Sequence, residues 1–304
     1  MGERTGAGER VKLGLSEIRI LILGAEILLG FQYEAIFQHG FSHLAFPLRA
    51  IEAAGLLILV LVVVLMIAPG PFHRISERGA ATERQNRFTD AMMVLSLAPF
   101  ALAIGLDIVV ALSSVLGLAG AALFGASLFL LSLVVWFGIA LMSRTPPPPP
   151  GPDEAVPLSE RISELMTEAR IVLPGVQALL GFQLVAYLTE FFPHLDRASK
   201  AFHTAGLAFL VICMILLIAP ASFHRIAEHG ECNERVERVG VAFLLASLVP
   251  LALALAADVF VALDVVFSNI AWAAVGCLAA LLVALGGWFA LPYVWRRPTR
   301  DSRR

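Results

Sequence analysis

Long apolar runs separated by short charged segments dominate the pattern of this 304-residue chain. Residues 115–142 contain no ionisable side chain, and about 20 apolar residues suffice for a helix to cross a hydrocarbon core of ~30 Å. The pattern predicts eight membrane-spanning helices, at residues 18–37, 50–69, 90–112, 115–142, 170–192, 201–220, 240–263 and 266–293. The expected fold class is therefore all-α, in a polytopic membrane protein.

Prolines and short polar segments set the predicted ends of these helices. Pro69 and Pro220 are expected to stop the second helix of each half, because proline lacks an amide donor. Ser113-Ser114 and the region of Asp264 are expected to connect the third and fourth helices.

The two halves of the chain repeat one another. Residues 67–79 read IAPGPFHRISERG and residues 218–230 read IAPASFHRIAEHG, a shift of 151 positions. The same shift superimposes LLGFQ at 28–32 on LLGFQ at 179–183, without a gap. The chain is therefore a tandem duplication, an arrangement common in membrane transport proteins.

The duplication and its flanking segments define the predicted domains. Five consecutive prolines lie between the halves and favour a semi-rigid polyproline II spacer. We expect a cytoplasmic tail at 1–15, a first four-helix membrane repeat at 16–142, a Pro-rich cytoplasmic linker at 143–166, a second four-helix membrane repeat at 167–293 and a basic cytoplasmic tail at 294–304.

Lysine and arginine are concentrated in the tails and in the loops between the second and third helices of each repeat. Positive residues mark the cytoplasmic side of membrane proteins. Both termini and the linker are therefore expected in the cytoplasm. An even number of helices per repeat makes the two repeats parallel, related by an axis along the membrane normal.

Composition agrees with a membrane protein and excludes other classes. Apolar residues make up 59% and charged residues 15% of the chain, and the mean hydropathy is +0.83. The net charge of −2 argues against nucleic-acid binding. We find no signature of a nucleophile elbow, a zinc protease, a phosphate loop or a dinucleotide fold, and expect neither enzymatic activity nor a cofactor or metal site.

The repeated FHR motif falls at the predicted cytoplasmic interface. One interpretation makes it a basic turn that anchors the second helix at the lipid headgroups. The other makes its histidines pH-responsive or ligand-contacting groups, because histidine titrates near neutrality. The residues of the motif are Phe72, His73 and Arg74 in the first repeat and Phe223, His224 and Arg225 in the second.

Polar residues inside the predicted helices are the main candidates for function, because a charge within the bilayer is costly unless it is paired or hydrated. Glu26 follows Arg19 by seven residues, about 10 Å along a helix. Gln32 and its equivalent Gln183 lie about 20 Å along their helices. Asp107 and Asp258, near the outer ends of the third helices, are expected at a similar depth.

Two interpretations of this polar layer stay open. The glutamines and aspartates supply the oxygen ligands that hard cations prefer, and intramembrane carboxylates relay protons. Alternatively, each aspartate lies near enough to the outer interface to be hydrated, to cap the next helix or to pair with Arg49 or Lys200. Glu26 has Gln177 as its equivalent and is therefore a candidate coupling residue in one repeat only.

Several motifs together resemble a bacterial four-span membrane family of unknown function. They are the segment LPGVQALLGFQ at 173–183, the A-P-x-x-F-H-R turn and the E-R pair of the inner loop. Members of that family often carry the label sodium:proton antiporter. The resemblance covers both units and implies a fused pair in the bacterial inner membrane, with the lipid bilayer, Na⁺ and H⁺ as partners and a homo-oligomer as one expected assembly. The alternative function is a non-transporting scaffold or regulator whose FHR loops bind lipid headgroups or a protein.

Overall fold

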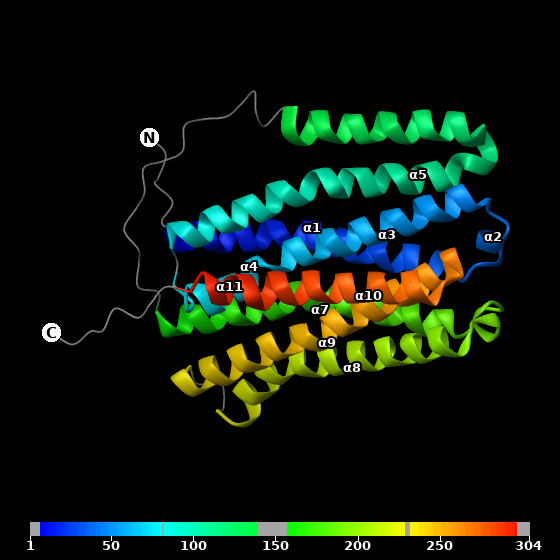
Figure 1. Cartoon of the computed structure of the whole chain (residues 1–304). Coiled ribbons are helices and arrows are strands. Elements are labelled where there is room, and N and C mark those ends of the chain that lie inside the picture. The colour runs from blue at the N-terminus through cyan, green and yellow to red at the C-terminus, as the bar shows by residue number, and fades with distance from the viewer. Residues whose placement is uncertain (1–6, 81, 139–156, 229–231, 297–304) are drawn as a thin grey trace.

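A computed structural model gives the arrangement of the chain in space, and it describes residues 7–80, 82–138, 157–228 and 232–296. Every regular element in these ranges is helical (Figure 1). The elements are α1 (Ala7–Ala35), α2 (His39–Ser42), α3 (Phe46–Ile67), α4 (Pro69–Pro71), η1 (Phe72–Ser76), α5 (Glu83–Leu133), η2 (Val134–Gly138), α7 (Leu158–Ala186), η3 (Phe192–His194), α8 (Arg197–Ile226), α9 (Glu234–Phe267), α10 (Ile270–Leu285), η4 (Gly286–Ala290) and α11 (Leu291–Val294).

Six helical segments of the described residues are long and apolar enough to cross a membrane. The predicted all-α membrane fold is confirmed at this level. The first predicted span lies in α1, which is not among the six and carries Arg19, Glu26 and Glu34 along its length. The six segments are Phe46–Ser76, Glu83–Gly138, Leu158–Ala186, Arg197–His224, Glu234–Phe267 and Ile270–Val294.

Helix α5 contains a sharp reversal that divides it into two arms (Figure 1). At Gly117 φ is 68° and ψ is 166°, a backbone conformation that is essentially restricted to glycine. The returning arm packs on the outgoing arm where Gly125 lies against Gly105. The predicted connection at Ser113-Ser114 is therefore wrong by a few residues, because the chain turns where glycine permits it.

The corresponding connection in the second half is also shifted. Helix α9 continues through Asp264 to Phe267, and Ser268 ends it in the left-handed conformation with φ of 50°. Asn269 then caps α10 by accepting from the backbone N–H of Ala271 at 3.0 Å. Asp264 instead accepts a hydrogen bond of 2.6 Å from the hydroxyl of Ser199.

The two prolines predicted to stop a helix behave differently. Helix α3 ends at Ile67, and the chain continues from Pro69 through α4 and the π-helical turn η1. Helix α8 instead continues through Pro220 to Ile226, so that the predicted stop is wrong in the second half. Proline removes one backbone donor, a loss that a long, well-packed helix tolerates.

Helices α1 and α7 lie side by side, and both begin at the end of the bundle where α5 and α9 begin (Figure 1). Phe31 and Phe182, which are 151 positions apart, meet across this seam with ring centroids separated by 4.6 Å. Helix α3 packs on α1 and α5, while α8 packs on α7 and α9. The α1–α7 seam therefore joins the two halves.

The C-terminal helices fasten the second half to the first. Helix α10 packs on α9 and also on α3. Trp288 of η4 is fully buried and donates its indole N–H to the Val64 carbonyl oxygen at 3.0 Å. This contact holds the end of the chain against the second helix of the first half.

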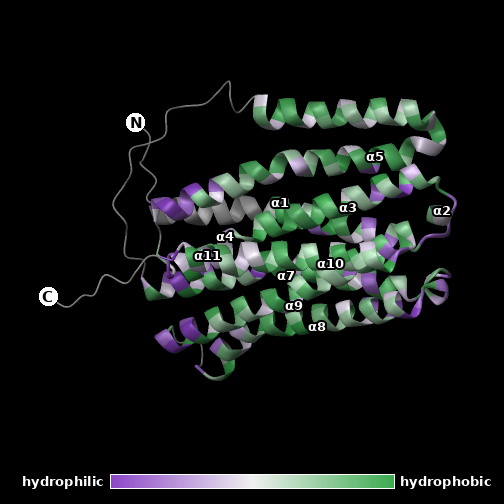
Figure 2. Ribbon diagram, viewed as in Figure 1, coloured by the Kyte–Doolittle hydropathy of each residue, from purple (hydrophilic) through white to green (hydrophobic). Residues whose placement is uncertain are grey.

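Hydrophobic residues cover the middle of the helices and hydrophilic residues gather toward their ends (Figure 2). Large apolar side chains remain exposed on the outer surface, above all on the returning arm of α5 and on α10. Leu123 and Trp272 are 72% and 64% exposed. An apolar surface of this extent is stable in lipid rather than in water.

Candidate functional site

Two glutamine–aspartate pairs lie inside the helix bundle, at equivalent positions of the two halves. The side-chain amide of Gln32, on α1, donates to the carboxylate of Asp107, on α5. In the second half, the amide of Gln183, on α7, donates to Asp258, on α9, at 2.5 Å. The structure thus brings together the polar residues that the sequence places in one layer.

A glycine lies behind each pair and permits the close approach of the helices. A Cβ atom at Gly55 would overlap the Gln32 amide. A Cβ atom at Gly206 would lie 3.3 Å from the Gln183 amide nitrogen and 3.5 Å from Asp258 Oδ1. The two glycines are themselves 151 positions apart, so that the same local design occurs twice.

An ionisable residue completes each site, and it differs between the halves. Glu52, on α3, is buried and interacts electrostatically with Asp107. Its equivalent, 151 positions later, is the fully buried His203, on α8. The first site therefore contains two carboxyl groups, while the second contains one carboxyl group and one imidazole.

His203 is held by two hydrogen bonds that define its role. Its Nε2 lies 3.1 Å from the backbone carbonyl oxygen of Gln183, which can only accept, so Nε2 carries hydrogen. In a neutral imidazole Nδ1 is then an acceptor, and the Tyr33 hydroxyl, 2.7 Å away, donates to it. Tyr33 belongs to α1 of the first half and also interacts with the Asp258 side chain. The second site thus includes a residue of the first repeat.

Several oxygen atoms of the two sites have no hydrogen-bond partner. They are Gln32 Oε1, Asp107 Oδ2 and Gln183 Oε1, all of them shielded from solvent. A buried acceptor without a partner costs about 1–3 kcal/mol, and a metal cation, a proton or a water molecule removes that cost. These oxygens therefore keep lone pairs that could accept a further hydrogen bond or a cation.

The predicted pairing of the aspartates with basic residues does not occur in the described part of the chain. Lys200 donates to the backbone carbonyl of Pro193 at 2.7 Å, and Arg49 forms no ion pair with either aspartate. Each carboxylate instead accepts a hydrogen bond from a glutamine amide, Asp107 from Gln32 and Asp258 from Gln183. Asp258 is only 2% exposed, which disfavours its hydration at the outer interface, whereas Asp107 is half-buried, so that alternative stays open for it.

Glu26 lies deeper in the α1–α7 seam and is fully buried. Neither carboxyl oxygen has a hydrogen-bond partner. The carboxyl group rests directly on the backbone of Gly175, where any side chain would overlap it. The equivalent residue, Gln177, is exposed, so the two halves are not symmetric at this position.

The FHR motif of the first half differs from an exposed headgroup anchor, which is one of the two interpretations of the sequence. Phe72, His73 and Arg74 are all buried. Arg74 forms a bidentate ion pair with Glu168, through Nε at 2.9 Å and Nη2 at 3.0 Å. His73 lies 3.8 Å from the buried carboxyl group of Glu164. The physical reason is that α7 of the second half supplies buried carboxylates to the motif.

In the second half, Phe223 and His224 are half-buried, and the side chain of Arg225 lies outside the described residues. One contact made by each motif is nevertheless equivalent in the two halves. The guanidinium of Arg84 lies 5.4 Å from the Phe72 ring centroid, and that of Arg235 lies 5.4 Å from the Phe223 centroid. These equivalent cation–π contacts give the repeated F and ER positions a structural role.

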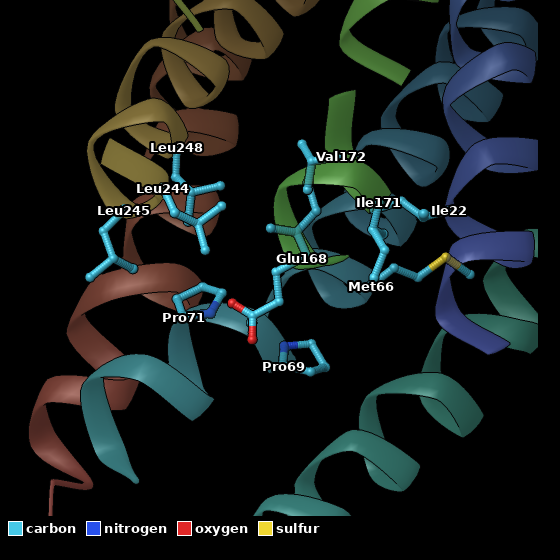
Figure 3. Close-up of a pocket in the computed structure, with 12 residues that line it drawn as sticks. Ile22, Met66, Pro69, Pro71, Glu168, Ile171, Val172, Leu244, Leu245 and Leu248 are labelled. Atoms are coloured by element: carbon cyan, nitrogen blue, oxygen red, sulfur yellow. The ribbon is translucent and has the colours of Figure 1, made fainter. Parts of the chain in front are cut away.

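An apolar pocket lined by residues of both halves lies beside the Glu168 carboxylate (Figure 3). Ile22, one helical turn before Glu26, lines it, and so does Val172, three residues before Gly175. The Glu168 carboxylate points toward Pro69 and Pro71 in its wall (Figure 3).

The sequence did not identify Tyr33, Glu164, Glu168 or His203 as site residues. The repeat could have pointed to His203, because a shift of 151 positions aligns it with Glu52, an ionisable residue of the first half. Glu164 has Leu13 as its equivalent, and Tyr33 has Leu184, so no repetition marks them. Within the described residues, no group of three or more potential metal-ligating His, Cys, Asp and Glu residues is present.

A model of the family of unknown function DUF6328 matches residues 10–140 and, a second time, residues 156–292. The two matches agree with the duplication seen in the sequence. No curated protein and no solved structure matches the chain.

Proposed function

The chain belongs to the DUF6328 family of unknown function, and we propose that it is a secondary transporter that exchanges a small cation, such as Na⁺, for protons. The observation that carries the proposal is the pair of equivalent Gln–Asp sites, one buried and one half-buried, which no lysine or arginine among the described residues neutralises. Such groups are costly in a membrane protein and commonly mark ion or proton pathways.

We propose further that the protein has eight spans, arranged as two parallel four-helix repeats. The two arms of α5 supply two of them, and α1 supplies one that is rich in polar residues. The meeting of Phe31 with its own equivalent Phe182 supports a pseudo-twofold axis through the α1–α7 seam. The distribution of lysine and arginine supports an inner-membrane orientation with both termini in the cytoplasm.

In the proposed mechanism, the first site binds the cation. Asp107 Oδ2 and Gln32 Oε1 are free acceptors, and the neighbouring Glu52 adds a second carboxyl group. Two carboxyl groups beside an amide oxygen form a donor set suited to a hard cation. A proton and the cation then compete for the same carboxyl oxygens of this site.

The second site carries protons in this mechanism. Asp258, His203 and Tyr33 form a connected set of groups that can donate and accept hydrogen. Glu26, buried in the seam without a hydrogen-bond partner, is the asymmetric coupling residue. Because Tyr33 and Gln32 are consecutive on α1, a movement of α1 displaces both sites together.

Ion flux in proteoliposomes tests the proposal. A pH-sensitive dye inside the vesicles reports proton movement when Na⁺, K⁺ or Li⁺ is added outside. We expect cation-driven flux that Asp107→Asn/Asp258→Asn abolishes. Glu190→Gln/Glu234→Gln serves as a control that removes the same charge from residues exposed to solvent.

The outcome separates the two functional classes. Flux that survives in the aspartate variant would exclude these carboxylates as the ion site. The absence of flux with every cation, from protein shown to be folded and inserted, would overturn the transporter and favour a non-transporting scaffold.

A further inference from the structure

A cleft lined by four arginines opens at the end of the bundle where α7 and α9 begin. Its lining residues are Arg74, Arg78, Gly79, Arg161, Glu237, Arg238 and Val241. They come from the FHR turn of the first half and from two helices of the second. None of them belongs to the glutamine–aspartate sites.

The charges of the cleft do not cancel. Glu168 pairs with Arg74 at 2.9 Å, and Glu237 pairs with Arg161 at 2.7 Å. Arg78 and Arg238 are exposed and form no ion pair within the described residues. The cleft therefore carries about two uncompensated positive charges.

Two guanidinium nitrogens in its walls lack a hydrogen-bond partner although they are shielded from solvent. They are Nη1 of Arg74, a residue only 6% exposed, and Nε of Arg161. Buried N–H donors are rarely left unpaired in proteins. A polar ligand that accepts from both would satisfy them without disturbing either ion pair.

The backbone is shaped so that the Arg74 guanidinium borders the cleft. Gly79 is buried and has φ of 78°, and Arg78 before it has φ of 55°, which is unusual for a residue with a side chain. A Cβ atom at Gly79 would lie 3.5 Å from Arg74 Nη1. The side chains of Glu237 and Arg161 border the same position, with Glu237 Oε1 at 3.8 Å and Arg161 Cδ at 4.0 Å, while Arg78 is exposed.

We infer that this arginine cleft binds a phosphate group, carried either by an anionic lipid headgroup or by a free phosphate anion. Guanidinium groups bind phosphate oxygens through charge-assisted, often bidentate hydrogen bonds. Two net positive charges match the charge of a phosphate monoester. The unpaired N–H groups of Arg74 and Arg161 in the wall would contact the anion from inside the cleft. The exposed Arg78 and Arg238 at the rim would contact the same anion from outside.

Binding to purified full-length protein in a neutral detergent tests the inference. The probes are dihexanoyl phosphatidic acid, dihexanoyl phosphatidylcholine and inorganic phosphate, each titrated by microscale thermophoresis. We expect Arg78→Gln/Arg238→Gln to weaken binding of the phosphatidic acid at least about tenfold. The control, Arg87→Gln/Arg197→Gln, removes the same charge from exposed arginines outside the cleft and is expected to bind as the natural chain does.

A second variant separates a built site from general electrostatic attraction. Arg161→Lys retains the charge and can still pair with Glu237, but it lacks the buried Nε donor. We expect it to bind more weakly than the control while its circular dichroism spectrum is unchanged.

The three probes identify the source of the phosphate. Binding of phosphatidic acid alone assigns the cleft to a lipid headgroup, while binding of inorganic phosphate with the same dependence on the arginines assigns it to the free anion. The inference is overturned if neither anion binds, or if the cleft variants and the control lose equal affinity.

Discussion

Replacing Glu168 with glutamine tests the contact between the two halves of the chain most directly. The Glu168 carboxylate accepts two hydrogen bonds from Arg74, at 2.9 and 3.0 Å, and the side chains are 5% and 1% exposed. Glutamine keeps one acceptor oxygen, but its NH₂ group replaces the second one. That NH₂ group is a donor and cannot accept the second guanidinium hydrogen bond. The Glu168→Gln variant therefore leaves a buried positive charge with a single hydrogen bond.

The expected loss of stability is large because the pair is buried. Removing one partner of a buried ion pair costs about 3–5 kcal/mol, and about 1.4 kcal/mol changes an equilibrium constant tenfold. The unfolding equilibrium constant should rise by roughly two to three and a half orders of magnitude. Reversible unfolding by dodecyl sulfate in mixed micelles, followed by far-ultraviolet circular dichroism, measures this change.

The second half supplies a matched control. Glu228 pairs with Arg235 at 3.0 Å, and the Arg235 side chain is 66% exposed. Glu228→Gln should cost less than about 1 kcal/mol, because exposed ion pairs contribute little. The double variant Arg74→Met/Glu168→Leu should recover most of the stability that Glu168→Gln loses, since it buries no unpaired charge. Equal small losses for Glu168→Gln and Glu228→Gln would refute the buried pair.

Three further predictions, one of them with a control variant, address other parts of the bundle. Glu26→Met should raise the free energy of unfolding by about 1–3 kcal/mol, because it removes a buried carboxyl group without a partner; a loss of stability in the same dodecyl sulfate titration would mean that Glu26 has a stabilising partner. Gly117→Ala should cost about 1–3 kcal/mol, since only glycine readily adopts the turn of α5. Gly181→Ala, in a helix with open space around it, should be neutral or stabilising in the same assay. Tyr33→Phe should cost about 1–3 kcal/mol by leaving His203 Nδ1 without its donor, and an unchanged midpoint would contradict the assigned tautomer.

The helical architecture was readable from the sequence because the bilayer imposes a simple length rule on apolar runs. The nearness of glutamine and aspartate within each half was readable as well, since the position of a residue along its helix follows from its number. The positions of the turns were less accurate. The sequence is apolar on both sides of Ser113 and of Gly117, so hydropathy does not show where the helix reverses. It reverses at Gly117 because glycine can adopt the backbone conformation of the turn.

The contacts between the halves could not be predicted in this way. Arg74 and Glu168 are 94 positions apart, and their meeting depends on which faces of the helices turn toward one another. Hydropathy does not encode that rotation. The FHR motif was therefore placed at an exposed interface, although its first copy is enclosed by carboxylates of α7. Unrepeated residues such as Glu164 gave no signal in the comparison of the halves.

The inequality of positions 26 and 177, and of positions 52 and 203, has a genetic consequence. In a dimer of identical subunits, one mutation alters both sides of the symmetry axis at once. In such a dimer, a carboxylate like that of Glu26 would be present on both sides of the seam. A histidine like His203 would likewise be present in both subunits. Fusion into one reading frame frees each half to be inherited with its own substitutions. Selection can then act on Glu26 and His203 separately, so that one half can specialise while the other retains its ancestral role.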